Sequence, residues 1–448
     1  MIRAAILTVL ALVFLGQPAE TWYFAQMIDS GDIVAFTMDG TVRPTSVKGD
    51  WQYGLRVDAE TVLLAIAPEG EATSLYRVTP DGADRIATPE SDGDFRQPLA
   101  FAKPFVVLRQ NTTVLPTPTL LVDASTGQAV LLTGKLPAIA RISADGSLLR
   151  YMSVDGDHWS LIERTLASGA ERTIVDFNTD NPLPLISADA HGDRWLYQTR
   201  DDDNTPIYNL LSVDGKQTQV DAGTREQPIS WSFLNDALIG NPFRCGDTCA
   251  LSVVQGDTQY SLPLPADDVY TPLAEPEPGA LLALDGDRKF WLLKADAEPL
   301  LVGLYDPTLI FMPASQLVSP DARYVLTSVA ENRYAVWDLR AGAPVVTLAA
   351  RYVGLILYND QGFLVHSYGD NEDSGLAYRY ADGASLTLPH TDVGLYFDLL
   401  PDGTLVYMLQ KADDAVGEPG IYRYEAAGDT YTPVLPGARL TPAPQALG

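Results

Sequence analysis

The chain has 448 residues, and its 58 aspartates and glutamates outnumber 30 lysines and arginines, so the formal net charge is −28 at pH 7. This charge argues against a nucleic-acid partner, because phosphates bind a basic surface, and it disfavours docking on an anionic membrane surface. Hydrophobic residues make up 46% of the chain, which predicts a folded protein and excludes a disordered one.

An apolar run follows a single positive charge at the N-terminus. Arg3 precedes residues 4–16, AAILTVLALVFLG, the layout of a secretory signal peptide. The run is shorter than the roughly 17–25 residues of a membrane-spanning helix. We expect residues 1–20 to be a cleaved signal peptide or, alternatively, a retained membrane anchor. The mature chain is then extracytoplasmic: periplasmic, secreted or tethered on the outer side, with membrane contact only through an uncleaved N-terminal segment.

A repeat runs through most of the chain. Each clear copy has an apolar strand, a turn containing Ser/Pro-x-Asp-Gly or a relative, and a second apolar strand, followed by a third strand, a glycine turn and a short fourth strand. The copies recur about every 43 residues, and four strands in roughly 40–45 residues are typical of a β-propeller blade. The aligned aspartates are Asp58, Asp145, Asp189, Asp236, Asp321, Asp360 and Asp402.

The repeat predicts an all-β fold, a single β-propeller of four-stranded blades over residues 51–436. Eight blades are favoured, with seven or nine as alternatives. Residues 21–50 contain strand-like segments and are expected to close the ring, with 32–38 adding a strand beside those at 421–436. Residues 437–448 are rich in proline and alanine and are expected to form a disordered tail.

The repeat motifs also resemble a known family. S-A-D-G (143–146), S-P-D (319–321) and L-P-D-G (400–403), each followed by a strand, resemble TolB-like and WD40-like propeller repeats over about residues 51–436. WD40 features are mostly missing, because Trp337 and Asp338 form the only Trp-Asp dipeptide. TolB-like proteins are exported binding proteins of envelope complexes. The resemblance implies a protein or peptide partner at a propeller face, without chemistry, and does not identify that partner.

Candidate catalytic and metal-binding residues are few. None of the four histidines, His158, His191, His366 and His390, has metal-ligand spacing with another histidine or a cysteine. The acidic clusters 201–204 (DDDN) and 369–373 (GDNED) are candidate Ca²⁺ loops, or otherwise solvated hairpin tips. No other cofactor and no catalytic residue is predicted. The favoured function is a non-enzymatic binding or scaffold protein; the alternative is an exported glycoside hydrolase or lyase acting on glycans through paired carboxylates.

The two cysteines, Cys245 and Cys249, flank a three-residue loop, Gly-Asp-Thr. A hairpin loop of this length places its flanking residues opposite each other, within disulfide reach. The spacing predicts a disulfide between them, with free thiols or a metal site as alternatives. A disulfide agrees with export, since such bonds persist in oxidising compartments.

Overall fold

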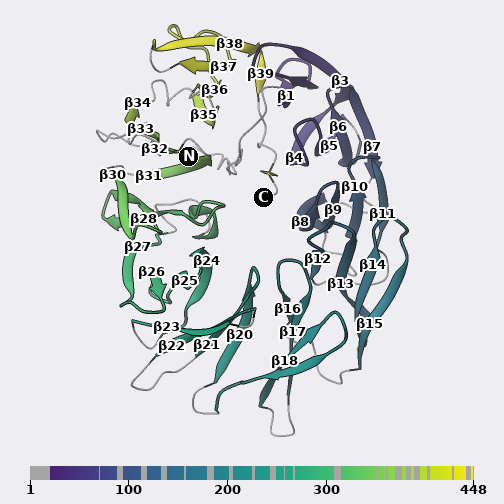
Figure 1. Ribbon diagram of the computed structural model, residues 1–448. Helices are drawn as coiled ribbons and strands as arrows, with labels where there is room; N and C mark the ends of the chain where they lie inside the picture. The colour runs from purple at the N-terminus through teal and green to yellow at the C-terminus, as the bar shows by residue number, and fades with distance from the viewer. Residues whose placement is uncertain are drawn as a thin grey trace, which may run out of the picture.

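The structure is a computed structural model. It describes residues 21–439 and 445–446, apart from gaps at 70, 88–93, 112–118, 133–138, 156–157, 179–185, 201–204, 225–227, 243–248, 257, 266–267, 307–313, 350–351, 360–361, 369–375, 380–384, 388–393, 401–403 and 426–427. Antiparallel sheets stand side by side around a central axis, so the protein is an all-β propeller (Figure 1). Within the described ranges no helix is long and apolar enough to cross a membrane.

The sheets between residues 50 and 263 each hold one repeat, and their strands pair in chain order. In Figure 1 the first strand of such a sheet lies toward the axis and the fourth lies at the outer edge, as for β4 (Asp50–Arg56) and β7 (Gly82–Ala87). The other strands of these sheets are β5 (Val62–Ala67), β6 (Ser74–Thr79), β8 (Asp94–Ala102), β9 (Phe105–Asn111), β10 (Thr119–Asp123), β11 (Gln128–Leu131), β12 (Ala140–Ile142), β13 (Leu148–Asp155), β14 (His158–Thr165), β15 (Glu171–Asn178), β16 (Ile186–Ala188), β17 (Arg194–Arg200), β18 (Pro206–Ser212), β19 (Gln217–Val220), β20 (Ile229–Leu234), β21 (Ala237–Pro242), β22 (Ala250–Gln255) and β23 (Thr258–Pro263).

Two successive repeats share one seven-stranded sheet, because Leu304 of the first pairs with Ser328 of the second. Two four-stranded sheets follow it along the chain. The strands of these three sheets are β24 (Thr271–Glu277), β25 (Ala280–Leu284), β26 (Lys289–Lys294), β27 (Leu300–Leu304), β28 (Tyr324–Ala330), β29 (Arg333–Asp338), β30 (Ala343–Ala349), β31 (Tyr352–Asn359), β32 (Gly362–Tyr368), β33 (Leu376–Arg379), β34 (Ser385–Thr387), β35 (Gly394–Leu399), β36 (Leu405–Leu409), β37 (Gly420–Glu425) and β38 (Thr430–Pro436), with the short 3-10 helix η1 (Ala314–Leu317) before β28.

The two ends of the chain close the ring in one sheet. Strands β1 (Tyr23–Met27), β2 (Asp32–Phe36) and β3 (Val42–Lys48) pair in sequence, and β39 (Ala438–Arg439) adds to β1. A further short strand, β40 (Gln445–Ala446), runs parallel to β4. Residues 438–439 and 445–446 are therefore strands, which corrects the expectation of a disordered tail for this part of 437–448. The expected pairing of 32–38 with 421–436 is also corrected. β2 pairs with β1 and β3, and the C-terminal strand β39 pairs with β1.

The favoured count of eight blades is not confirmed. The described strands form nine sheets, one of which contains two repeats. A count of eight requires either that one weak repeat is an insertion or that residues 21–50 complete the last repeat. Instead, the last repeat already has four strands of its own, β35–β38, and the terminal strands build a separate sheet.

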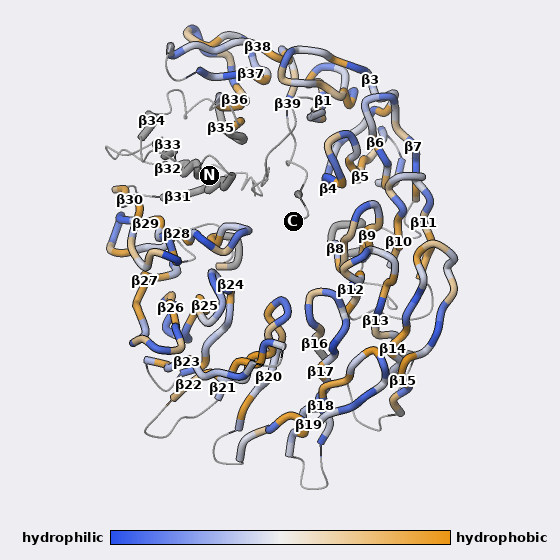
Figure 2. Tube along the Cα trace, in the orientation of Figure 1, coloured by the Kyte–Doolittle hydropathy of each residue, from blue (hydrophilic) through white to orange (hydrophobic). Residues whose placement is uncertain are grey.

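The hydrophobic core lies between neighbouring sheets, because alternate side chains of a strand point to opposite faces. On one face of the terminal sheet, Tyr23 and Ala25 pack against the last repeat, including Val406. On the other face, Phe24 packs against the next sheet, including Leu64. Similar clusters fill the junctions from β4 to β30, and Figure 2 shows hydrophobic positions along these strands. The sheets that share these clusters therefore depend on one another for burial.

Candidate functional site: turns and an outer interaction surface

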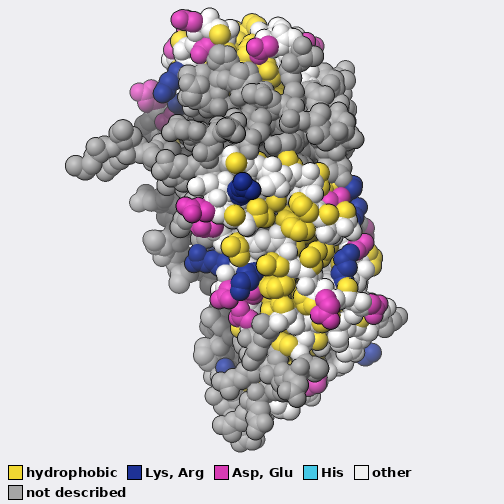
Figure 3. Space-filling model, turned by 90° about the vertical axis from the view of Figure 1, so that its left-hand side faces the viewer, with side chains coloured by type: hydrophobic (Ala, Val, Ile, Leu, Met, Phe, Trp, Pro, Cys, Tyr) yellow, Lys and Arg dark blue, Asp and Glu magenta, His cyan; other side chains and the backbone are white. Residues whose placement is uncertain are grey.

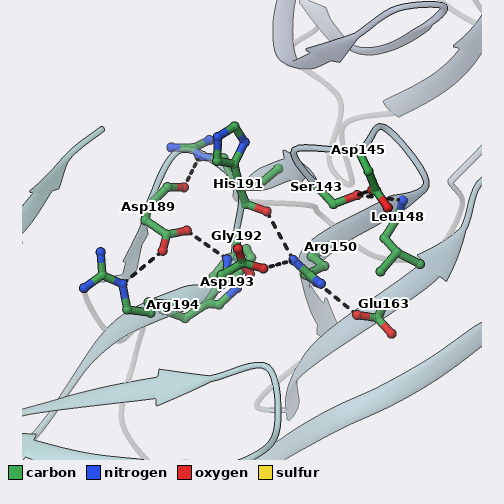
Figure 4. Close-up of polar contacts among 12 residues, drawn as sticks. Ser143, Asp145, Leu148, Arg150, Glu163, Asp189, His191, Gly192, Asp193 and Arg194 are labelled. Atoms are coloured by element: carbon green, nitrogen blue, oxygen red, sulfur yellow. Dashed lines mark hydrogen bonds and ion pairs between the residues drawn. The ribbon is translucent and has the colours of Figure 1, made fainter. Parts of the chain in front are cut away.

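The aspartates of the repeat organise turns. Asp145 Oδ1 accepts hydrogen bonds from Ser143 Oγ at 2.6 Å and from the backbone N–H of Ser147 at 3.0 Å (Figure 4). These hydrogen bonds lower the pKa of the Asp145 carboxyl to about 2. In a later repeat, Asp321 accepts from Ser319 Oγ at 2.6 Å in the same way. The repeat motif is therefore explained by local folding, because its carboxylates satisfy turn donors.

Charged side chains then join one repeat to the next. Arg150 of β13 donates to Glu163 Oε2 of β14 at 3.0 Å, and its Nη1 reaches Asp193 of the following repeat at 2.5 Å (Figure 4). The same Nη1 donates to the backbone carbonyl of His191 at 3.3 Å. Burial opposes ionisation of Glu163, but hydrogen bonds from Arg172 and Arg150 outweigh it and hold its pKa below the usual value. The network stabilises the junction between two sheets.

Three of the four histidines lie in segments that the structure describes. His158 begins β14 and is exposed, His191 lies in the turn before β17, and His366 lies in β32. His390 and both acidic clusters, 201–204 and 369–373, lie outside the described residues. Among the residues that the structure describes, no group of three His, Cys, Asp or Glu side chains is placed to hold a metal ion. The predicted Ca²⁺ loops stay predictions.

The predicted disulfide also stays a prediction, because Cys245 lies outside the described residues. Cys249 directly precedes β22 and is partly buried against the cluster that joins the sheet β20–β23 to the next repeat. The repeat aspartates Asp58, Asp189 and Asp236 lie in the described turns, whereas Asp360 and Asp402 do not.

An apolar surface is exposed on the outer side of the seven-stranded sheet. We call it the outer patch and define it by Leu300, Leu301, Leu304, Val329 and Val345, whose exposed fractions run from 37% to 44%. Figure 3 shows hydrophobic side chains gathered on this side of the ring, with charged side chains of both signs around them.

The outer patch spans two repeats. Leu300 belongs to β27, and its side chain lies close to Gly342, in the turn before β30, where a Cβ would be 3.7 Å from Leu300 Cδ2. At the rim, Lys289 Nζ forms an ion pair with Asp287 at 2.8 Å. An apolar centre with a charged rim is the arrangement of a protein-binding surface.

The outer patch is not among the sites predicted from the sequence. The segment LLVGL at 300–304 has apolar residues at successive positions of a fourth strand, where one face meets solvent. This departure from alternation was the available signal. The contribution of Val345 from the neighbouring repeat had no such signal, because its position beside β27 follows from how two repeats join.

No family model matches the chain, and no curated protein matches it. The chain is similar to several solved structures. A eukaryotic initiation factor is 11% identical over 96% of this chain and 100% of its own, with a TM-score of 0.45. Oligogalacturonate lyase from Vibrio parahaemolyticus is 10% identical over 69% of this chain and 93% of its own, with a TM-score of 0.41. TolB from Acinetobacter baumannii is 14% identical over 57% of this chain and 67% of its own, with a TM-score of 0.28.

The chain spans about half the length of some other matches, covering 52% of an acylaminoacyl peptidase and 55% of a prolyl endopeptidase. All these identities and TM-scores are too low to carry an argument about function.

Proposed function

We propose that this propeller is a non-enzymatic binding or scaffold protein that works outside the cytoplasm and holds a protein partner on its outer patch. The observation that carries the proposal is the group of exposed aliphatic side chains on β27, β28 and β30. Removing such side chains from water favours association by roughly 25 cal/mol per Å² of apolar area. The extracytoplasmic location rests on the apolar run at 4–16.

The strand arrangement also suits a partner. β30 is the last strand of its sheet, and its outer edge has no paired strand among the described residues. Such an edge offers backbone N–H and C=O groups to an extended segment of a partner, while the exposed Val345 adds an apolar contact. The glycan-active alternative stays a prediction of the sequence, since no observation on the described residues favours it.

The experiment is a cross-linked co-purification of the tagged full chain from its native source, followed by mass spectrometry. Leu301→Asp tests the outer patch, and Val130→Asp is the matched control, because Val130 is a similarly exposed aliphatic residue (42% against 44%) on another outer strand, β11. We expect Leu301→Asp to recover the partner at least about tenfold less than the wild type, the loss of an interface hot spot. Val130→Asp should recover it normally.

Equal recovery of every co-purified protein by Leu301→Asp and the wild type would overturn the proposal. Circular dichroism of both variants establishes that the strands are retained, so a loss of binding is not a loss of fold. Release of sugar products from oligosaccharides by the purified protein would instead favour the glycan-active alternative.

A further inference from the structure

A second candidate binding site lies where the terminal sheet meets the sheet β4–β7. A pocket of about 850 Å³ opens between the β2–β3 turn on one side and the β4–β5 and β6–β7 turns on the other. Its volume falls within the range of roughly 300–1,000 Å³ that is typical of ligand sites. The pocket lies on a different part of the ring from the outer patch and does not depend on it.

The lining of the pocket has more negative than positive charge. Four carboxylates, Asp39, Glu60, Asp81 and Asp84, face two guanidinium groups. Both guanidinium groups are already engaged by the protein itself. Arg77 pairs with Asp84 at 3.3 Å, and its Nε donates to the carbonyl of Ala124 at 2.6 Å. An anion entering the pocket would therefore meet uncompensated carboxylates, whereas a cation would be attracted.

The chain itself shows how the pocket holds a guanidinium group. Arg43 lies over the ring of Trp22, with its Cζ 4.8 Å from the ring centroid, and its Nη1 pairs with Asp81 at 2.8 Å. The Arg43 side chain is still 50% exposed and that of Asp81 87% exposed. An aromatic face and a carboxylate together form a site for a guanidinium or ammonium group. This contact within the chain shows an arginine held by two groups of the pocket lining.

Two further carboxylates remain available to a ligand. Asp39 accepts hydrogen bonds from the Thr37 hydroxyl and from the backbone N–H of Thr41, and these lower the pKa of its carboxyl, so Asp39 stays ionised. Glu60 is exposed, and its carboxylate has no hydrogen bond or ion pair to any residue that the structure describes. The same ranges hold no metal-binding group of three such side chains. The arrangement suits an organic cation better than a metal ion.

We propose that this pocket binds an arginine-containing peptide segment, with Asp39 and Glu60 receiving its guanidinium groups. The threonine hydroxyl groups of the lining, such as those of Thr61 and Thr79, offer donors and acceptors to the peptide backbone. The chain's net charge of −28 draws such a segment toward the protein.

The test is isothermal titration calorimetry of the full chain with the blocked peptide acetyl-Gly-Arg-Gly-Arg-Gly-amide. The comparison peptide carries citrulline in place of arginine, which keeps the shape and removes the charge. We expect the citrulline peptide, and the Glu60→Gln variant with the arginine peptide, each to bind about tenfold more weakly. The Asp39→Asn/Glu60→Gln double variant should bind still more weakly.

Asp214→Asn is the matched control. Asp214 accepts from Ser212 and from the backbone N–H of Lys216, so it caps a turn as Asp39 does, but in the sheet β16–β19. We expect this variant to bind the arginine peptide as the wild type does. Equal affinity for the two peptides, equal affinity of the double variant and the wild type, or no measurable binding would each overturn the proposal. Equal weakening by Asp214→Asn would also overturn it, because binding would then follow overall charge.

Discussion

Gln26 and Arg439 lie 413 residues apart in the sequence and are joined by side-chain hydrogen bonds. Arg439 Nε and Nη2 both donate to Gln26 Oε1, at 3.3 and 3.1 Å. Beside them, Met27 pairs with Ala438, which is fully buried. The N-terminal and C-terminal strands thus share a sheet, and its opening would expose a strand edge and a core cluster.

Ring closure predicts the effect of a C-terminal truncation. Ending the chain after Pro436 removes β39, and we expect the free energy of unfolding to fall by roughly 2–4 kcal/mol, because a buried cluster loses one side. Urea unfolding followed by circular dichroism measures it. A chain that ends after Arg439 keeps β39 and should lose less. Identical unfolding midpoints for the two truncated chains would show that β39 contributes nothing to closure.

The repeat turns predict opposite effects on stability for two reciprocal substitutions, glycine to alanine in one turn and alanine to glycine in another. Gly146 and Ala322 occupy the same turn position after Asp145 and Asp321, and both have left-handed backbone, with φ of 69° and 55°. A residue with a Cβ costs about 1–2 kcal/mol there, and glycine costs about 0.5–1 kcal/mol in chain entropy. Gly146→Ala should lower the free energy of unfolding by roughly 1 kcal/mol, and Ala322→Gly should raise it by roughly 0.5 kcal/mol. Thermal melts of both variants would contradict this if the two changes had the same sign.

The buried Arg150–Glu163 pair predicts a pH-dependent stability. Glu163 has a lowered pKa in the folded state. Its contribution is therefore present above the unfolded-state pKa of about 4.3 and is lost as the pH falls through the lower folded-state value. Near pH 7, Arg150→Ala should lower the free energy of unfolding by about 1.5–3 kcal/mol, because Glu163 loses one of its two arginine partners and keeps Arg172.

The control for this pair is Lys289→Ala, which removes the exposed ion pair with Asp287 at 2.8 Å. It should cost under about 1 kcal/mol. Urea titrations at pH 7 and at several values below 4.3 measure both variants. The difference in the free energy of unfolding between Arg150→Ala and the wild type should become smaller as the pH falls through this range. A constant difference would mean that ionisation of Glu163 does not contribute.

The cysteine pair predicts a covalent link that chemistry can test directly. We expect Cys245 and Cys249 of the protein from its native compartment to be oxidised to each other. Mass spectrometry without reduction should then find the peptide that spans them lighter by two hydrogen atoms. Reduction should lower stability by about 2 kcal/mol, since the closed loop is short. Two alkylated thiols in native material would contradict both the link and the oxidising location.

The all-β repeat was predictable from the sequence because each copy carries its own folding information. Ser143 and Asp145 form hydrogen bonds within a few residues of each other, so the pattern that specifies the turn is local. The alternation of apolar residues likewise predicts a strand that is packed on its neighbours, but it does not identify the sheets against which that strand packs. Fold class, turn positions and the approximate period therefore follow from the chain alone.

The sites were decided by contacts between repeats, which no local pattern records. In the sequence Ala438 belongs to a segment expected to be a disordered tail, and only the structure places it beside Met27. Val345 joins the outer patch only because its repeat shares a sheet with β27. Arg43 meets Asp81 across a junction between two sheets. Closing a ring brings together residues far apart in the chain, and the packing of whole sheets determines which of them meet. The energy of this packing is shared among many side chains, so only the tertiary structure shows where surfaces and pockets form.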